Sequence, residues 1–401
     1  MTASSPAPRG DFITLSGWYG FANAGDDAIL RVVLSELTDR CGMEVRVLTR
    51  PGADVRQSAG RPIATIVHED LVGAGALGNW LTGRAWRFIR EIRKSRAVLI
   101  GGGSLLHDRM TRRSLARVLD EVLMGRIWGI RTAFIAVGVG PLTTALGKRL
   151  VRMGVMSADT VTVRDQASRD LLVSVGVPGS HVVVTSDPSF LLPSKEFALG
   201  PLEAFMSPAD GAPVLGVYLV DQIGLSPAKR NRFVRSVASA LDRLHRSHGA
   251  RFVLVPLRCH AEGDDRIIAH EVAGHVEQPG IVHCHETLQS PEELKWLAGR
   301  FTATIAVRLH ALFFSLAHHV PVVAIDRDPK VRNAMNAFDL DEYVVEIDDQ
   351  IGERLVERAS ACLGSLPALR AHLAMRTPLH VEQARKLFDD LRRFLGLTPT
   401  A

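Results

Sequence analysis

Short apolar segments alternate with helical patterns along almost all of this 401-residue chain, and this alternation limits the folds open to it. Valine- and isoleucine-rich runs separated by helices are typical of a parallel sheet with helices on both faces. In the first half we expect strands at 12–16, 45–49, 63–67, 97–100, 132–137, 160–163 and 182–185. In the second half we expect strands at 214–220, 252–256, 281–283, 302–307, 322–325 and 343–347.

The alternation pauses between residues 187 and 213, a stretch that contains five prolines. Proline and glycine clusters are typical of linkers. We therefore predict a flexible tail at 1–10, a Rossmann-like domain at 11–190, a linker at 191–213 and a second Rossmann-like domain at 214–365. Residues 366–401, with helix formers broken at Pro378, are expected to form one or two helices that pack across the domains. Two such domains in tandem are expected to enclose a cleft at the carboxyl ends of both sheets.

The composition argues against several classes of function. The net charge of +5 is too small to indicate nucleic-acid binding, and three tyrosines offer little for base stacking. The four cysteines are widely separated, which argues against a disulfide framework or a zinc site and favours the cytoplasm. No apolar run approaches the roughly 18 residues of a membrane span. The mildly basic charge fits a small acidic substrate or a membrane surface, and the composition as a whole fits a soluble enzyme.

Two glycine-rich segments follow expected strands. Glycines let backbone N–H groups approach a ligand, and the start of a helix favours an anion. The segment 17–27 leads into a helix predicted at 26–37, and its candidates are Gly20, Asn23, Gly25 and Asp26. An ordinary turn capped by the aspartate is the alternative. The segment 101–108 contributes Gly102, Gly103, Ser104 and Asp108. Asp108 is a candidate base or ligand of a sugar hydroxyl, and the alternative is a solvated acid or a cap.

Arg164 stands at the end of the strand 160–163. Its planar guanidinium suits a carboxylate or a phosphate, although an ion pair with a neighbouring acid explains it equally well.

The segment Arg308-Leu309-His310 follows a buried-type strand and precedes an apolar helix at 311–317. Arg327 and Lys330 follow the next strand. The carboxyl ends of neighbouring parallel strands meet at one edge of a sheet, so these cations should cluster. Histidine, whose unperturbed pKa is about 6.5, is the side-chain type best suited to donate a proton there. We predict a site for a small dianion with a proton donor.

Two other features have simpler explanations. His283-Cys284-His285 has no second ligand group at a recognisable spacing, so we expect surface or packing histidines and no metal. His260 lies after the strand 252–256 and is a candidate for lining the cleft. The stretch 80–96 predicts one basic helix. Contact with anionic lipid would use its arginines, but we favour a helix packed on its apolar side and solvated on the other.

Taken in order, these segments resemble the polysaccharide pyruvyl transferase family. The matching stretches are 17–30, 101–108, 137–141, 164–168, 185–188, 308–312 and 328–331. The resemblance implies a GT-B-like fold and transfer of the enolpyruvyl group of phosphoenolpyruvate to a saccharide, which forms a pyruvate ketal. Implied acceptors are saccharides of cell-wall polymers, including those that anchor S-layers and those that are lipid-linked, and of exopolysaccharides. Two positions differ from the family pattern, at 218–221 and at Arg327, and both concern the acceptor.

The mechanism we expect needs no cofactor. Arg164, Arg308, Leu309 and Lys330 bind phosphoenolpyruvate, His310 protonates its methylene carbon, and Asp108 or Asp26 accepts the proton of the sugar hydroxyl. The alternatives are a GT-B nucleotide-sugar glycosyltransferase and a non-catalytic glycan- or anion-binding relative.

Overall fold

The computed structural model describes residues 10–50, 52–69, 76–108, 112–208, 210–221, 223–261 and 263–397, without the side chains at 112–114 and 116–118. Residues 1–9 of the predicted tail lie outside this set. The chain divides into two compact units. Unit 1 comprises Met1–Phe21, Asp26–Leu191 and His380–Ala401, and unit 2 comprises Ala22–Gly25 and Leu192–Leu379.

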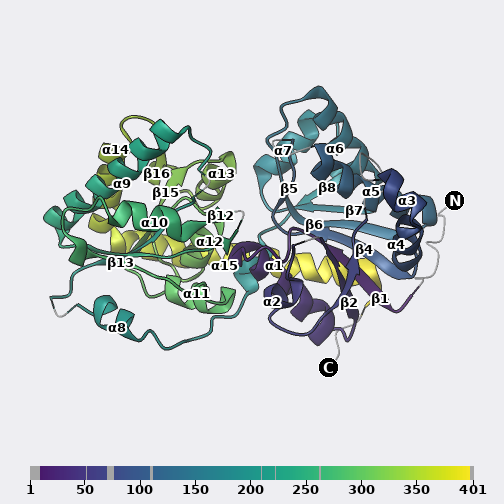
Figure 1. The fold of residues 1–401 in the computed structure, drawn as a ribbon, viewed down its shortest axis with the longest axis horizontal. Helices are drawn as coiled ribbons and strands as arrows, with labels where there is room; N and C mark the ends of the chain where they lie inside the picture. The colour runs from purple at the N-terminus through teal and green to yellow at the C-terminus, as the bar shows by residue number, and fades with distance from the viewer. Residues whose placement is uncertain are drawn as a thin grey trace. The chain divides into compact units, whose positions relative to one another are not determined.

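The sheet of unit 1 is parallel, with the strand order β3-β2-β1-β4-β6-β7-β8 (Figure 1). Its strands are β1 (Phe12–Ser16), β2 (Glu44–Thr49), β3 (Ala64–Val67), β4 (Ser95–Gly101), β5 (Ser104–Leu106), β6 (Arg131–Val139), β7 (Thr160–Val163) and β8 (Val182–Val184). The short β5 pairs with the end of β6, outside the main order. The order reverses between β1 and β4, as in a Rossmann fold.

Helices connect these strands. They are α1 (Ala24–Leu34), extended by a π-helical turn (Ser35–Asp39), α2 (Val55–Ala59), α3 (Ala76–Leu81), α4 (Arg84–Ile92), α5 (Arg112–Trp128), α6 (Ala145–Ser157) and α7 (Gln166–Ser174). Phe88 and Ile92 of α4, Val122 of α5 and Val155 of α6 pack in one buried apolar cluster with strand residues such as Phe134. Alternate side chains of a strand point to opposite faces, so the other face is left for α1.

Unit 2 repeats the architecture with the order β13-β10-β9-β14-β15-β16. Its strands are β9 (Val214–Tyr218), β10 (Arg251–Leu254), β13 (Val282–Cys284), β14 (Ala303–Ala306), β15 (Val322–Asp326) and β16 (Val344–Glu346), with a small hairpin of β11 (Cys259–His260) and β12 (Gly263–Asp264). Here the order reverses between β9 and β14. The pairing of β14 with β15 confirms the expected neighbourhood of 302–307 and 322–325.

The helices of unit 2 are α8 (Pro201–Met206), α9 (Pro227–His248), α10 (Asp265–Ala273), α11 (Pro291–Ala298), α12 (Leu309–Ala317), α13 (Pro329–Ala337) and α14 (Ile351–Gly364). Turns of 3-10 helix stand at Gly179–His181, Pro188–Leu191, Pro279–Ile281 and Asp341–Tyr343. α15 (Leu366–Leu395) supplies its first part to unit 2 and its last part to unit 1.

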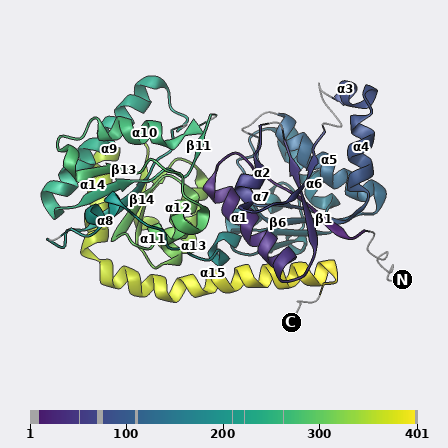
Figure 2. The same ribbon diagram turned by 60° about the horizontal axis from the view of Figure 1, so that its bottom comes forward.

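The predictions for three helical segments were wrong. α15 continues through Pro378 as one helix (Figure 2), because buried side chains such as Leu373 and Leu387 hold it on either side of the proline. The basic stretch 80–96 is divided: Gly83, with a left-handed backbone (φ +73°), separates α3 from α4, and Arg96 lies in β4. The helix after β14 begins at Leu309, so His310 belongs to its first turn.

Candidate functional site

Each sheet has one point where the strand order reverses, and in open α/β sheets ligands bind beyond the carboxyl ends of the strands at that point. In unit 1 the segments 17–21 and 102–104 follow the two strands β1 and β4 that flank it. In unit 2 the corresponding segments are 219–221 and 307–310, after β9 and β14. The topology therefore places Arg308 and His310 where a ligand of unit 2 is expected.

Arg308 is the residue at which β14 becomes α12. It occupies the N-cap position in an extended conformation (φ −85°, ψ 125°), and its carbonyl accepts hydrogen bonds from the amides of Ala311 and Leu312. The first N–H groups of a helix lack intrahelical partners and attract anions. The buried side chain of Leu309 anchors this turn in the apolar interior.

Asp265, the first residue of α10, holds the Arg308 side chain. The guanidinium donates from Nε to Asp265 Oδ2 (3.1 Å) and from Nη2 to Oδ1 (2.5 Å), and the carboxylate is 2% exposed. The same carboxylate accepts from the amides of Asp221, Leu257 and Arg258. It therefore ties together the loops that follow β9, β10 and β14. A two-point ion pair of this kind fixes the orientation of the arginine.

His310 packs against a glycine that lies far away in the sequence. Residues 22–25 are part of unit 2: the amide of Ala24 donates to Leu257 O (2.9 Å), and Asn23 forms an antiparallel bridge with Arg258. A Cβ atom at Gly25 would lie 2.0 Å from His310 Nδ1, so any side chain there would displace the imidazole from this position. On its other sides the imidazole contacts the rings of Phe313 and Phe314, with centroids 5.9 and 6.3 Å away.

The remaining candidates of unit 2 lie on neighbouring loops. Arg327 follows β15 and donates from Nε to the carbonyl of Ile223, in the loop after β9 (3.3 Å). Lys330 is in the first turn of α13, and its Nζ lies 3.9 Å from the carboxylate of the N-cap residue Asp328. His260 is in the β11–β12 hairpin and is half-buried. Arg308 and His310 thus follow β14, and Arg327 and Lys330 follow the paired strand β15.

In unit 1 the glycines of the second segment have left-handed backbones, with φ +79° at Gly102 and +78° at Gly103. A Cβ at Gly102 would lie 2.7 Å from Ile29 of α1, and one at Gly103 would lie 2.7 Å from the Asp26 carboxylate. Asp26 itself is buried. These glycines therefore serve the close approach of α1 to the end of β4, with the acid directly at the turn.

Gly20 has a packing role in unit 1. Its backbone has φ +91°, and its amide donates to the hydroxyl of Ser58 (3.1 Å). Its carbonyl accepts from the amide of Asp54 (2.8 Å), just before α2. Gly20 fastens the turn after β1 to α2.

The carboxylate of Asp108 is hydrogen-bonded to the loop before α6. Its carboxylate accepts from the amides of Thr143 and Thr144 and from both hydroxyls, at 2.6–3.1 Å. Desolvation raises the pKa of this carboxyl, but the hydrogen bonds outweigh it and lower the pKa to about 2. Such a carboxylate is a weak base at neutral pH, and the geometry is that of a cap for the loop before α6.

Arg164 lies inside unit 1, with a side chain only 3% exposed. It donates to the hydroxyl of Ser104 (2.9 Å) and lies 3.5 Å from Asp187 Oδ2 and 3.7 Å from Asp165 Oδ2. A Cβ at Gly138 would meet its guanidinium at 2.7 Å. The ion pair considered from the sequence is present, and it braces the start of β5.

From the sequence, no individual role was predicted for Asp265, Asp187 or Tyr19. Tyr19 is buried and donates to the carbonyl of Gly101 (2.6 Å), and burial, followed by nearby acids including Asp26, raises its pKa. Asp265 had one available signal, since it begins a helix after a strand of the second domain. The hydrogen bonds of its carboxylate to three loops could not be predicted, because no local sequence pattern indicates them.

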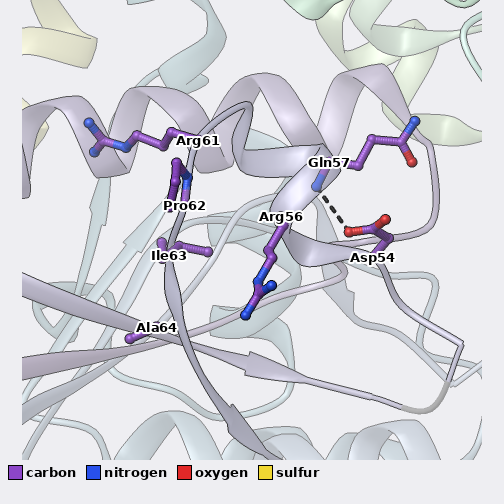
Figure 3. Close-up of a pocket in the computed structure, with 7 residues that line it drawn as sticks. All are labelled: Asp54, Arg56, Gln57, Arg61, Pro62, Ile63 and Ala64. Atoms are coloured by element: carbon purple, nitrogen blue, oxygen red, sulfur yellow. Dashed lines mark hydrogen bonds between the residues drawn. The ribbon is translucent and has the colours of Figure 1, made fainter.

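Other parts of the described chain offer weaker candidates for a functional site. A surface hollow of about 820 Å³ lies along Asp54–Gln57 and Arg61–Ala64, but Arg56 and Arg61 point apart in it (Figure 3). Arg61 also pairs with Asp39 (2.6 Å). Among the described residues no group of three or more His, Cys, Asp or Glu is placed to hold a metal. Burial lowers the pKa values of His283 and His285, and the neighbouring His283 lowers that of His285 further.

Solved structures show the same fold. A putative UDP-N-acetylglucosamine 2-epimerase from Listeria monocytogenes aligns with a TM-score of 0.65 at 12% identity, over 96% of this chain and 97% of that one. UDP-GlcNAc 2-epimerase from Neisseria meningitidis, bound to UDP-GlcNAc, gives 0.62 at 14% identity, over 95% and 99%. The Anabaena protein HepE in complex with UDP-glucose gives 0.60 at 12% identity, over 95% and 99%. The expected architecture of two Rossmann-like, GT-B-like domains is confirmed.

The family is shown by the sequence over most of its length. The model of the polysaccharide pyruvyl transferase family matches residues 23–329, which include Asn23, Gly25, Gly102, Gly103 and the segment from Arg308 to His310. No helix of the described residues is long and apolar enough to cross a membrane. This chain is therefore a transferase that belongs to the polysaccharide pyruvyl transferase family.

Proposed function

We propose that the donor of this transferase is phosphoenolpyruvate and that the acceptor is a saccharide of a cell-wall polymer or exopolysaccharide precursor. The observation that carries the proposal is the turn from β14 to α12, where an oriented arginine and a histidine share one helix start. A donor with a carboxylate and a phosphate needs several cations, and its enol carbon needs a proton donor. The turn offers both kinds of group.

In this proposal Arg308, the first amides of α12 and Lys330 bind the anionic groups of the donor. Asp265 uses two of the five N–H groups of the guanidinium, which leaves the outer edge of the fork for a ligand. Because the aspartate fixes the fork before the donor arrives, little side-chain freedom is lost on binding. Lys330 adds a cation from the neighbouring strand end, and its side chain is 36% exposed.

His310 is the proposed general acid. Its proton goes to the methylene carbon of phosphoenolpyruvate, which becomes a methyl group and leaves C2 electron-poor. One sugar hydroxyl attacks C2 and loses its proton to a base. Phosphate then departs, and a second hydroxyl attacks C2 and closes the ketal. Of the two hydroxyl protons, one replaces that given by His310 and the other leaves with hydrogen phosphate, so the reaction is balanced.

We assign the base to Asp26, which directly follows Gly25 in the sequence. Asp108 is the poorer choice, because five hydrogen bonds stabilise its ionised form. Arg164 is reassigned from donor ligand to positioning residue, since it is buried and bonded to Ser104. Gly102 and Gly103 then shape the backbone around the acid within unit 1.

The experiment measures phosphate release and ketal formation from phosphoenolpyruvate with a panel of acceptor glycans. His310→Ala and Arg308→Ala are each expected to lower kcat/KM at least about a hundredfold, as loss of a general acid or an oriented charge does. His270→Ala on α10 and Arg358→Ala on α14 are matched controls, since both side chains are well exposed outside the turn. In heavy water the ketal methyl group should carry one solvent deuterium. Wild-type turnover in either active-turn variant would refute the assignment.

Binding separates the alternatives. A ligand present at about 100 times its Kd raises stability by about 2.7 kcal/mol, which a thermal-shift assay detects. Phosphoenolpyruvate should raise the unfolding midpoint, and a panel of nucleotide sugars should not. The opposite result would favour a nucleotide-sugar glycosyltransferase, and binding of donor or glycan without turnover would favour a non-catalytic relative.

A further inference from the structure

We propose that unit 1 docks on an anionic lipid bilayer through the surface formed by α3, α4 and the end of α5, with a phospholipid phosphate in the hollow beside Trp86. We call this the α3–α4 surface. Its apolar members are Leu77, Trp80, Leu81 and Trp86, its basic members are Arg84, Arg87, Arg90, Arg93 and Lys94, and Trp128 of α5 borders it. The inference does not depend on which donor the enzyme uses.

The apolar part is a compact tip. Leu77 and Leu81 are one helical turn apart on α3 and are 69% and 79% exposed. Trp80 contacts Trp86 of α4 edge to face, with ring centroids 5.2 Å apart, and Trp86 is 63% exposed. Exposed leucines and tryptophans gathered at one place are unusual on a surface that faces only water.

The apolar side chains on the inward side of α4 are already packed against the core of unit 1. Phe88, Ile89 and Ile92 are buried in the apolar cluster of unit 1. The exposed tip is therefore additional to what the fold of unit 1 needs. The prediction of a helix packed on its apolar side holds for α4, but it does not account for Trp86 or for α3.

A cationic hollow lies next to the tip. It has a volume of about 520 Å³ and is lined by Trp86, Arg87, Ile89, Arg90, Arg93, Lys94 and Trp128. Glu91 neutralises part of this charge, since its carboxylate lies 2.8 Å from Lys94 Nζ. Residues 76–94 contain five basic side chains and this one acid, a net charge of +4. The hollow has the charge and the aromatic walls to take a phosphate group.

The combination identifies the partner as a bilayer. A membrane interface offers a layer of phosphates directly above an apolar layer, which matches cations flanking a leucine and tryptophan tip. Tryptophan favours this boundary because its ring is apolar and its N–H is polar. A nucleic acid or an acidic protein surface would use the arginines but would leave Leu77 and Leu81 in water.

The test measures co-flotation of the full chain with vesicles. One set is phosphatidylcholine alone, and the other is equal parts of phosphatidylcholine and phosphatidylglycerol. The charge variant is Arg87→Gln with Arg90→Gln and Arg93→Gln, and the apolar variant is Leu77→Ser with Leu81→Ser. All five side chains are exposed, so both variants should fold.

Matched controls exist elsewhere in the chain. Lys229→Gln, Arg235→Gln and Arg243→Gln remove three exposed charges from α9, a helix that carries no exposed large apolar side chain. Leu146→Ser with Met153→Ser removes two exposed apolar side chains from α6.

We expect binding only to vesicles with phosphatidylglycerol, and weaker binding as salt rises. Each arginine removed should weaken binding about fivefold, the equivalent of ~1 kcal/mol, so the charge variant should lose about a hundredfold. The apolar variant should also lose binding, and both controls should bind like the unmodified chain. Equal loss in the α9 control, full binding by the apolar variant, tighter binding to duplex DNA, or no vesicle binding at all would each overturn the proposal.

Discussion

Replacing Gly25 with alanine is the sharpest test of the role given to His310. The added Cβ would lie 2.0 Å from Nδ1, 2.4 Å from Cγ and 2.8 Å from Cε1 of the imidazole. An ordinary contact between such atoms is about 3.5 Å, so the ring must move by about 1.5 Å. Phe313 and Phe314 limit its escape, with ring centroids 5.9 and 6.3 Å away.

The effect on activity should exceed the effect on stability. Gly25 is the second residue of α1, where alanine is the better helix former by about 1 kcal/mol, and this gain offsets part of the clash. A catalytic group displaced by about 1 Å can cost about a hundredfold in rate. We therefore expect kcat to fall about a hundredfold, with an unfolding midpoint close to that of the unmodified protein.

A steady-state assay of phosphate release measures the change, and Gly364→Ala is the matched control. Gly364 is also helical, at the end of α14, and a Cβ there meets nothing within 4 Å. In His310→Ala the same Gly25 substitution should cost nothing further, because the ring it displaces is gone. Full activity in Gly25→Ala, or additive losses in the double variant, would show that the position of His310 does not limit the reaction.

Three further predictions concern charges. Asp265→Asn should lower kcat/KM for the donor about tenfold or more by releasing Arg308, and the loss should lie mainly in KM. Asp108→Ala should cost about 1 kcal/mol of stability at neutral pH, as loss of a cap does. Because the Asp108 pKa is lowered to about 2, that difference in unfolding midpoint should be present above pH 4 and shrink as the pH falls towards about 2. Burial lowers the pKa of Lys295 to about 8, so the unfolded chain binds more protons between about pH 8 and 10.5, and stability should rise by up to about 3 kcal/mol through that window. Lys295→Met should abolish this rise, and an unchanged pH profile in that variant would contradict the reasoning.

Most of the fold could be predicted from the sequence because strands and helices have local signatures. The strand Thr160–Val163 was predicted to the residue, and the start of β1 at Phe12 is as expected. The features that local sequence patterns did not predict are either short or determined by packing. β5 is three residues long and exists through its pairing with β6, and the first turn of α12 takes in His310 because the chain leaves its extended conformation at Arg308, the N-cap position.

By itself the sequence determined which residues stand at the carboxyl ends of strands, and so named Arg308, His310, Gly25 and Asp26 as candidates. Order along the chain decides this, because a strand followed by a helix leaves its last residues at the edge of the sheet. Only the tertiary structure decided which candidates act on one another. Gly25 meets His310 across some 285 residues of chain, and Asp265 orients Arg308 from another loop. Contacts between loops that are distant in sequence depend on how strands are ordered in a sheet, and no local pattern of residues encodes that order.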